Sequence, residues 1–146
     1  MYGQPSGMNK LLLSLLLLTA PALAHTALAQ KRDYDAQGRS TGRSEISGDT
    51  RRDYDAQGRT VGRAETSGGT TRLYDAQGRS TGRVDASGDT RRLYGAQGRS
   101  AGRTDVSGDT ARHYDAQGRS SGRSEARGDV VRHYDAQGRL TGTTRR

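Results

Sequence analysis

Hydrophobic residues follow two contrasting patterns along the chain. A leucine-rich run covers residues 11–18, whereas the chain beyond residue 29 is polar and contains few large apolar side chains. In this second part a tyrosine recurs every 20 residues, and Ala-Gln-Gly-Arg begins two positions after each one. The recurring tyrosines are Tyr34, Tyr54, Tyr74, Tyr94, Tyr114 and Tyr134. Strict spacing without insertions indicates tandem structural units and argues against a disordered chain.

Each unit contains two turn signals, which predict two short antiparallel strands. The segment Asp35-Ala36-Gln37-Gly38 matches a type I turn, and a left-handed Gly38 closes a three-residue hairpin loop with a bulge. This register sets Asp35 opposite Arg39 as a cross-strand charge pair. A second signal, Ser47-Gly48-Asp49, recurs with variation in the following units. Two turns per 20 residues leave strands of about six residues each.

The predicted register also assigns a face to each column of the repeat. It sets Tyr34 opposite Ser40 and Arg32 opposite Gly42, so the tyrosines face inward over small residues and cover the strand glycines. Those glycines are Gly42, Gly62, Gly82, Gly102, Gly122 and Gly142. The opposite face, which we expect to meet solvent, carries a variable column: Asp33, Asp53, Leu73, Leu93, His113 and His133.

The elements add up to an all-β domain over residues 30–146. The chain enters on a strand at residues 30–35 and leaves on one at 139–146, so six hairpins supply twelve strands. An even number lets the last strand pair antiparallel with the first, which removes both sheet edges. We therefore predict six tandem antiparallel hairpins closed into a shallow symmetric barrel. The opposing prediction, a disordered chain, rests on the scarcity of Leu, Ile, Val and Phe.

Residues 1–29 have the organisation of a secretory signal peptide. Lys10 precedes the leucine-rich run, and two small-x-small cleavage sites follow, at Ala22-Leu23-Ala24 and Ala27-Leu28-Ala29. We favour cleavage after the second site and Met8 as the translation start. The run is shorter than the ~20 apolar residues that a membrane-spanning helix needs, and no second apolar segment follows. We expect an exported protein, periplasmic or extracellular, without a transmembrane segment after signal removal; an uncleaved anchor is the alternative.

Composition adds a basic charge and excludes cysteine chemistry. The formal net charge is +8 at pH 7, and every basic residue except Lys10 and Lys31 is an arginine. Without cysteine there is no disulfide scaffold and no thiolate metal site. A basic chain suits anionic partners such as polysaccharide or lipid head groups, although acidic residues alternate with the arginines. Nucleic acid is a less suitable partner, because export separates the chain from it and inward-facing tyrosines do not stack on bases.

Two columns of arginine form the candidate ligand site. One follows the first turn of each unit: Arg39, Arg59, Arg79, Arg99, Arg119 and Arg139. The other follows each strand glycine and stops at Thr143: Arg43, Arg63, Arg83, Arg103 and Arg123. In a closed barrel each column becomes a ring that can hold phosphate or sulfate groups bidentately. The competing interpretation pairs these arginines with neighbouring Asp and Glu residues, except at Arg99, where Gly95 replaces the aspartate.

The sequence predicts neither an active site nor a bound cofactor. Beyond residue 29 the only histidines are His113 and His133, which offer no serine–histidine–aspartate arrangement. Closure brings Asp33 beside His133, where a two-histidine, one-carboxylate metal site is conceivable. We instead interpret this column as polar surface and predict no metal. The Asp-Ala-Gln-Gly turns also lack the spaced oxygen ligands of a calcium loop.

Two known repeat families resemble this pattern. Tyr-Asp-x-x-Gly-Arg at a period near 20 resembles the YD or RHS repeats of bacterial toxin shells and teneurins, best at residues 134–140. Gly-Arg-Ser-Thr-Gly-Arg at 38–43 and 78–83, followed by Ser-Gly-Asp-Thr and a Tyr-Asp hairpin, is more similar to the small exported β-flower proteins. That resemblance covers residues 30–146 and implies a shallow barrel of hairpin petals. The likeness of β-flowers to tubby-type domains implies an association with lipid or membrane, without assigning residues.

These observations support three functional hypotheses. The first is a non-enzymatic exported module, structural or ligand-binding, that acts in the cell envelope. The second is a discrete binder of an anionic group, a phospholipid head group or a polysaccharide, through the arginine rings. The third is a disordered basic secreted repeat protein.

Overall fold

The computed structural model describes residues 29–146, in which two kinds of strand alternate. The tyrosines lie on β1 (Ala29–Asp35), β3 (Thr50–Asp55), β5 (Thr70–Asp75), β7 (Thr90–Gly95), β9 (Thr110–Asp115) and β11 (Val130–Asp135). The strand glycines lie on β2 (Ser40–Ser47), β4 (Thr60–Ser67), β6 (Ser80–Ser87), β8 (Ser100–Ser107), β10 (Ser120–Arg127) and β12 (Leu140–Arg145). The predicted signal peptide lies outside the described residues except for Ala29. Within the described part, no helix is long and apolar enough to span a membrane.

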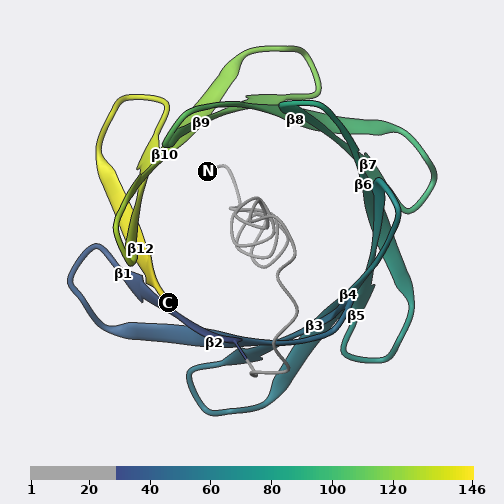
Figure 1. The fold of residues 1–146 in the computed structure, drawn as a ribbon, viewed down its shortest axis with the longest axis horizontal. Helices are drawn as coiled ribbons and strands as arrows, with labels where there is room; N and C mark the ends of the chain where they lie inside the picture. The colour runs from purple at the N-terminus through teal and green to yellow at the C-terminus, as the bar shows by residue number, and fades with distance from the viewer. Residues whose placement is uncertain (1–28) are drawn as a thin grey trace, which may run out of the picture.

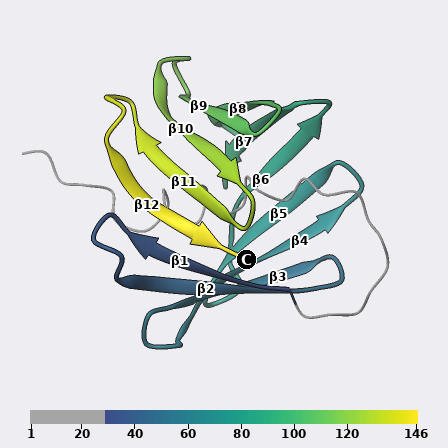
Figure 2. The ribbon, with the colours of Figure 1, turned by 60° about the vertical axis from the view of Figure 1, so that its left-hand side comes forward.

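The sheet closes on itself. Each strand pairs antiparallel with the next along the chain, and β12 pairs with β1. Figure 1 shows the ring of strands viewed along its axis, and Figure 2 shows β12 beside β1. The closing pairs, from Arg32–Arg145 to Asp35–Gly142, repeat the register found between β2 and β3. The predicted barrel of six hairpins and twelve strands is confirmed, and the disordered alternative is wrong for these residues.

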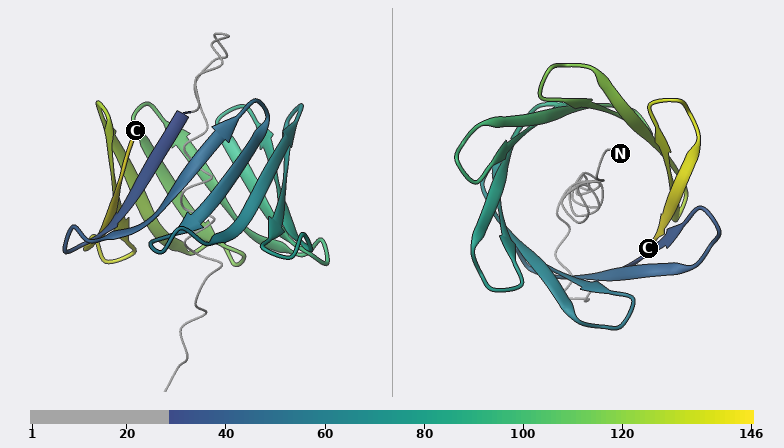
Figure 3. Two further views of the ribbon diagram at one scale, coloured as in Figure 1. Left: turned by 90° about the horizontal axis from the view of Figure 1, so that it is seen from below. Right: turned by 180° about the vertical axis from the view of Figure 1, so that it is seen from behind.

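The two kinds of turn lie at opposite rims of the barrel. The Asp-Ala-Gln-Gly turns flare outward as petals, whereas the Ser-Gly-Asp-Thr turns continue the line of the wall (Figure 3). We call these the petal rim and the turn rim. In the first petal Gly38 N donates to Asp35 O at 3.0 Å, and Asp35 N donates to Arg39 O at 2.9 Å. With Gly38 at φ 78°, these bonds confirm the predicted turn and its glycine bulge.

A further bulge, one residue beyond each petal turn, was not predicted. Tyr34 pairs with Ser40 as expected, but Asp33 pairs with Gly42, so Thr41 has no partner and the register shifts by one residue. The same shift occurs in the other five hairpins. Because side chains alternate across a strand, one extra residue exchanges the two faces of the hairpin.

This exchange of faces overturns three predictions. Arg32 pairs with Arg43 and not with Gly42. Arg43 pairs with Tyr54 on the next strand and lies over its ring, so the tyrosines share the outer face with this column of arginines and do not face inward. The variable column faces the inner wall and not solvent: Asp33 is half-buried and the other five members are buried, with Asp53 5% exposed and His133 6% exposed. The solvent-facing surface predicted for this column is therefore wrong.

The strand glycines are needed because neighbouring strands approach closely at this column. A β-carbon at Gly42 would collide with the Tyr54 carbonyl oxygen of β3. One at Gly142 would collide with the Tyr34 carbonyl oxygen across the junction of β12 with β1, which we call the seam. The colliding atoms belong to the backbone, which cannot rotate aside. Close approach of two strands, and not cover by a tyrosine ring, therefore requires glycine here.

The inner wall divides into an apolar half and a polar half. The variable column packs beside a second inward-facing column: Ser44, Ala64, Val84, Thr104, Ser124 and Thr144. On β4–β7 the two columns form an apolar cluster of Ala64, Leu73, Val84 and Leu93. From β8 through the seam to β3, the same columns carry hydroxyl, imidazole and carboxylate groups. The charged and titratable groups of these two columns are thus concentrated on one side.

Candidate functional site

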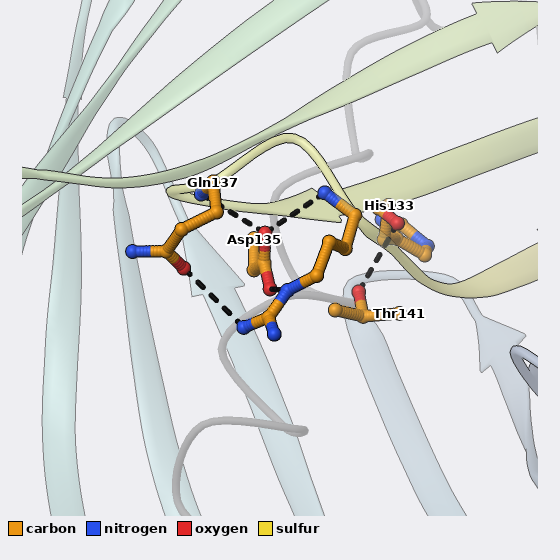
Figure 4. Close-up of polar contacts among 5 residues, drawn as sticks. His133, Asp135, Gln137 and Thr141 are labelled. Carbon is orange, nitrogen blue, oxygen red and sulfur yellow. Dashed lines mark hydrogen bonds and ion pairs between the residues drawn. The ribbon is translucent and has the colours of Figure 1, made fainter.

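The first arginine ring lies on the petal rim, where five of its members are held by the aspartate of their own turn. In these units the arginine Nε lies 2.7 Å from the aspartate Oδ2. The Oδ1 atom accepts the backbone N–H groups of the turn glutamine and arginine at 2.9–3.0 Å. Figure 4 shows this arrangement around Asp135 and Gln137. The pairs are Asp35–Arg39, Asp55–Arg59, Asp75–Arg79, Asp115–Arg119 and Asp135–Arg139.

These contacts orient the rim arginines while leaving them accessible. The paired arginine side chains are 76–77% exposed. The carboxylate is contacted through Nε, so the terminal nitrogens remain able to donate to an anion. The pKa of each aspartate is lowered, first by the backbone N–H of the arginine and further by its guanidinium. The pairs therefore stay ionised at neutral pH.

The fourth unit differs, because Gly95 takes the place of the aspartate. The turn itself persists, since Gly98 N donates to Gly95 O and Gly95 N donates to Arg99 O, both at 2.9 Å. No ion pair to Arg99 forms within residues 29–146. This petal thus carries a positive charge that its own turn does not compensate.

The second arginine ring is built into the outer wall. Each guanidinium carbon lies 4.3–4.5 Å from the ring centroid of the tyrosine on the next strand. Each Nε also contacts the Asp or Glu two positions later, at 2.8–3.2 Å. At the seam, where Thr143 replaces the arginine, Arg145 lies 5.3 Å from the ring of Tyr34. Stacking on tyrosine and ion pairing thus hold the arginines of this second ring against the wall and leave them fewer free donors for a ligand.

A line of hydrogen bonds runs along the polar half of the inner wall and crosses the seam. It joins, in order, Thr104, His113, Ser124, His133, Thr144 and Asp33. Each contact between a histidine nitrogen and a hydroxyl oxygen is 2.9 Å. Thr144 donates to Asp33 Oδ1 at 2.6 Å, which links β12 to β1. Closure thus brings Asp33 and His133 together as predicted, but with a threonine hydroxyl between them.

The direction of this line follows from the single hydrogen on each hydroxyl group. Because Thr144 donates to Asp33, it must accept from His133 Nε2–H, which leaves Nδ1 of a neutral His133 as an acceptor. Ser124 therefore donates to His133 and accepts from His113 Nε2–H. We assign both histidines to the neutral Nε2–H tautomer, oriented by the Asp33 carboxylate.

Burial keeps these imidazoles neutral. Desolvation, followed by the charge of His133, lowers the pKa of His113 to about 4. Desolvation also lowers the pKa of His133, although the Asp33 carboxylate opposes this effect. Both ring nitrogens of each histidine are engaged with hydroxyl groups, and no group of three metal-ligating side chains occurs in the described part of the chain. The line links and orders the side chains of the polar half of the inner wall.

Basic side chains also face inward near the turn rim. Arg51 Nη2 lies 2.9 Å from Asp53 Oδ2, and both residues are buried. Ser44 donates to the other oxygen of Asp53 at 2.7 Å. The pKa of Lys31 is lowered, chiefly by desolvation and then by Arg146 and Arg51. Sequence reasoning missed this inner group of charges because it placed the neighbouring column on the solvent face.

A signal for the inner wall is nevertheless present in the sequence. Residues nine positions apart share their character, being either both polar or both apolar. The pairs are Ser44 with Asp53, Ala64 with Leu73, Val84 with Leu93, Thr104 with His113 and Ser124 with His133. Each pair consists of directly opposed residues on neighbouring strands. Matched change in two columns indicates that their side chains meet in an enclosed space.

Comparison with known proteins supports the architecture. No protein-family model matches the chain, and no curated protein matches it. Among solved structures, the crystal structure of a protein from Arabidopsis thaliana is similar, with a TM-score of 0.51 and 12% sequence identity over 78% of each chain. At this identity the likeness concerns the fold alone.

Proposed function

We propose that this chain is an exported, non-enzymatic module of the cell envelope whose petal rim binds an anionic envelope component. The observation that carries the proposal is the ring of petal-rim arginines, held in place by Nε and exposed over about three-quarters of the side chain. The signal-like pattern of residues 1–29 and the resemblance to exported β-flower proteins support export. A phosphate, sulfate or carboxylate group on a lipid or a polysaccharide offers the acceptors that such guanidinium groups recognise.

Repetition around one rim suits an extended ligand better than a small one. Each Asp–Arg pair is neutral overall, so a single petal attracts an anion only at short range. Several petals that contact the same membrane surface or polymer act together, because the first contact raises the effective concentration of the others. Arg99, without an aspartate beside it, is expected to contribute more than any other single petal.

The proposal is tested by binding at several salt concentrations. The purified protein is mixed with phosphatidylglycerol vesicles, phosphatidylcholine vesicles or alginate, and bound protein is measured by co-sedimentation. We expect binding to anionic vesicles or to alginate at low salt, a steep loss as salt rises, and no binding to phosphatidylcholine. Absence of binding to both anionic probes at low salt contradicts the proposal.

Matched variants locate the binding surface. Replacement of Arg39, Arg79 and Arg119 by glutamine removes three charges from the petal rim and should weaken binding by about tenfold or more. Replacement of Arg32, Arg72 and Arg112, which are exposed on the outer wall, removes the same charge elsewhere and serves as the control. Equal losses in the two triple variants would mean that net charge alone acts, and the rim site would be wrong.

A further inference from the structure

A cavity lies on the inner wall where β4–β7 approach the turn rim. Its volume is about 140 Å³, and it is lined by Thr66, Gly68, Gly69, Thr71, Val84, Ala86 and Arg91. It adjoins the apolar half of the wall, because Val84 belongs to the apolar cluster. It lies at the opposite rim from the petals and shares no residue with the proposed rim site.

Arg91 brings a cation to this cavity without an internal counter-ion. Its Nη1 atom is buried and has no hydrogen-bond partner, and no ion pair to Arg91 forms in the described part of the chain. Arg51 occupies the same column two units earlier, but it pairs with Asp53, whereas the corresponding neighbour of Arg91 is Leu93. A buried donor without an acceptor is unfavourable, so this position favours binding of an acceptor from outside.

The rest of the cavity lacks acidic groups and offers hydroxyl groups. Thr66 Oγ1 and Thr71 Oγ1 lie 3.0 Å apart, so these two hydroxyl groups lie together in the lining. Gly69 stands where four other units have an aspartate: Asp49, Asp89, Asp109 and Asp129. This turn therefore lacks the negative charge that the equivalent turns carry. Val84 and Ala86 complete the lining with apolar surface.

We propose that this cavity binds a small aliphatic carboxylate. The carboxylate accepts from the Arg91 guanidinium and from a threonine hydroxyl, and the short hydrocarbon part packs on Val84 and Ala86. The volume admits a ligand of only a few carbon atoms. A phosphate shares the anionic chemistry but has no apolar group to place on the hydrophobic lining, so the carboxylate is favoured.

Calorimetric titration of the full chain with sodium butyrate tests the proposal, with inorganic phosphate and butylamine as comparison probes. Butyrate should bind in the millimolar range, phosphate more weakly, and butylamine not at all. In NMR spectra butyrate should shift the amide signals of Gly69 and Thr71 and leave those of the petal rim unchanged. This localisation separates the inner site from the rim site, so either proposal can fail without the other.

Three variants decide the roles of the residues. Arg91→Ala introduces the residue that Ala111 provides in the same column, so the barrel should fold, and butyrate binding should fall by about tenfold or more. Gly69→Asp introduces the residue of the equivalent turns and should weaken binding by repulsion. Asp109→Gly makes the reverse exchange at a turn that does not line the cavity and should leave binding unchanged. No butyrate binding to the wild-type chain, equal binding to Arg91→Ala, or phosphate binding as tight as butyrate binding would overturn the proposal.

Discussion

At the scale of single residues, the side chains of the two inward-facing columns are buried in two ways: by aliphatic packing on one half of the wall and by hydrogen bonding on the other. On β4–β7, aliphatic side chains such as Val84 and Leu93 remove apolar surface from water. On the polar half, Thr104 and His113 occupy the equivalent positions and satisfy each other by a hydrogen bond. The histidines thus replace aliphatic packing with a polar network that is fully partnered at both ring nitrogens.

The buried histidines make the stability of the barrel dependent on pH. The pKa of His113 falls from 6.5 in the unfolded chain to about 4 in the folded one, so below pH 6.5 the unfolded state binds more protons. His113 therefore does not lower the free energy of unfolding above about pH 6.5, and it lowers it progressively as the pH falls toward 4. The loss from His113 is on the order of 3 kcal/mol. Urea denaturation at a series of pH values measures it.

A double substitution isolates this effect. Thr104→Val together with His113→Leu reproduces the opposed pair Val84 and Leu93 of the neighbouring unit. We expect the decline between pH 6.5 and 4 to shrink, leaving the part due to His133 and, below about pH 4.5, the part due to Glu125, whose pKa is lowered by the Arg123 side chain. The stabilising contribution of the petal aspartates is lost mainly as the pH falls below their ordinary pKa of 3.8, so it changes little between pH 6.5 and 4. An unchanged pH profile in the double variant would contradict the assignment.

At the scale of the hairpin, five of the six petals are stabilised by one carboxylate each, which accepts hydrogen bonds from three donors. The aspartate accepts two backbone N–H groups and the arginine Nε, which holds the turn closed and orients the guanidinium. Both tasks depend on residues within one turn, so they follow from local sequence. The bulge beyond the turn then decides which face of the hairpin points inward.

Gly95→Asp should raise the thermal unfolding midpoint. The aspartate would accept the amides of Gln97 and Arg99 and pair with the Arg99 side chain, as in the other five petals. Replacement of glycine also reduces the conformational freedom of the unfolded chain. The same variant should weaken binding to anionic vesicles, because it neutralises the one uncompensated petal. Differential scanning calorimetry and co-sedimentation test the two effects, and a lower midpoint would contradict the account of the turn.

At the scale of the whole molecule, closure gives the chain an inside. The seam joins β12 to β1 through a ladder and through the hydrogen bond from Thr144 to Asp33. The inner wall is buried only because the sheet is complete, and the closed sheet leaves no edge for other chains to pair with. The hairpins are therefore not expected to be independently stable.

Removal of residues 126–146 should abolish cooperative folding. The truncated chain loses β11 and β12, which exposes the edges of β1 and β10 and leaves Asp33 without the Thr144 hydroxyl. We expect circular dichroism to show a broad, non-cooperative melt, and gel filtration to show association through the open edges. A sharp melt with a monomeric elution volume would mean that each hairpin is stable without closure.

The amino-acid sequence determined the unit length, the turn types, the twelve strands and their capacity to close, because each depends on residues a few positions apart within one unit. Gly38 indicates a left-handed turn, and Asp35 indicates the carboxylate that accepts the backbone N–H groups of that turn, independently of the neighbouring units. Only the tertiary structure decided which columns face inward. Two registers one residue apart satisfy the same petal turn, and the choice between them depends on contacts with the next strand. The close approach of Gly42 to the backbone of β3, and the burial of Ser44 against Asp53, exist only once neighbouring hairpins meet. The inner histidines and the cavity at Arg91 are products of that choice.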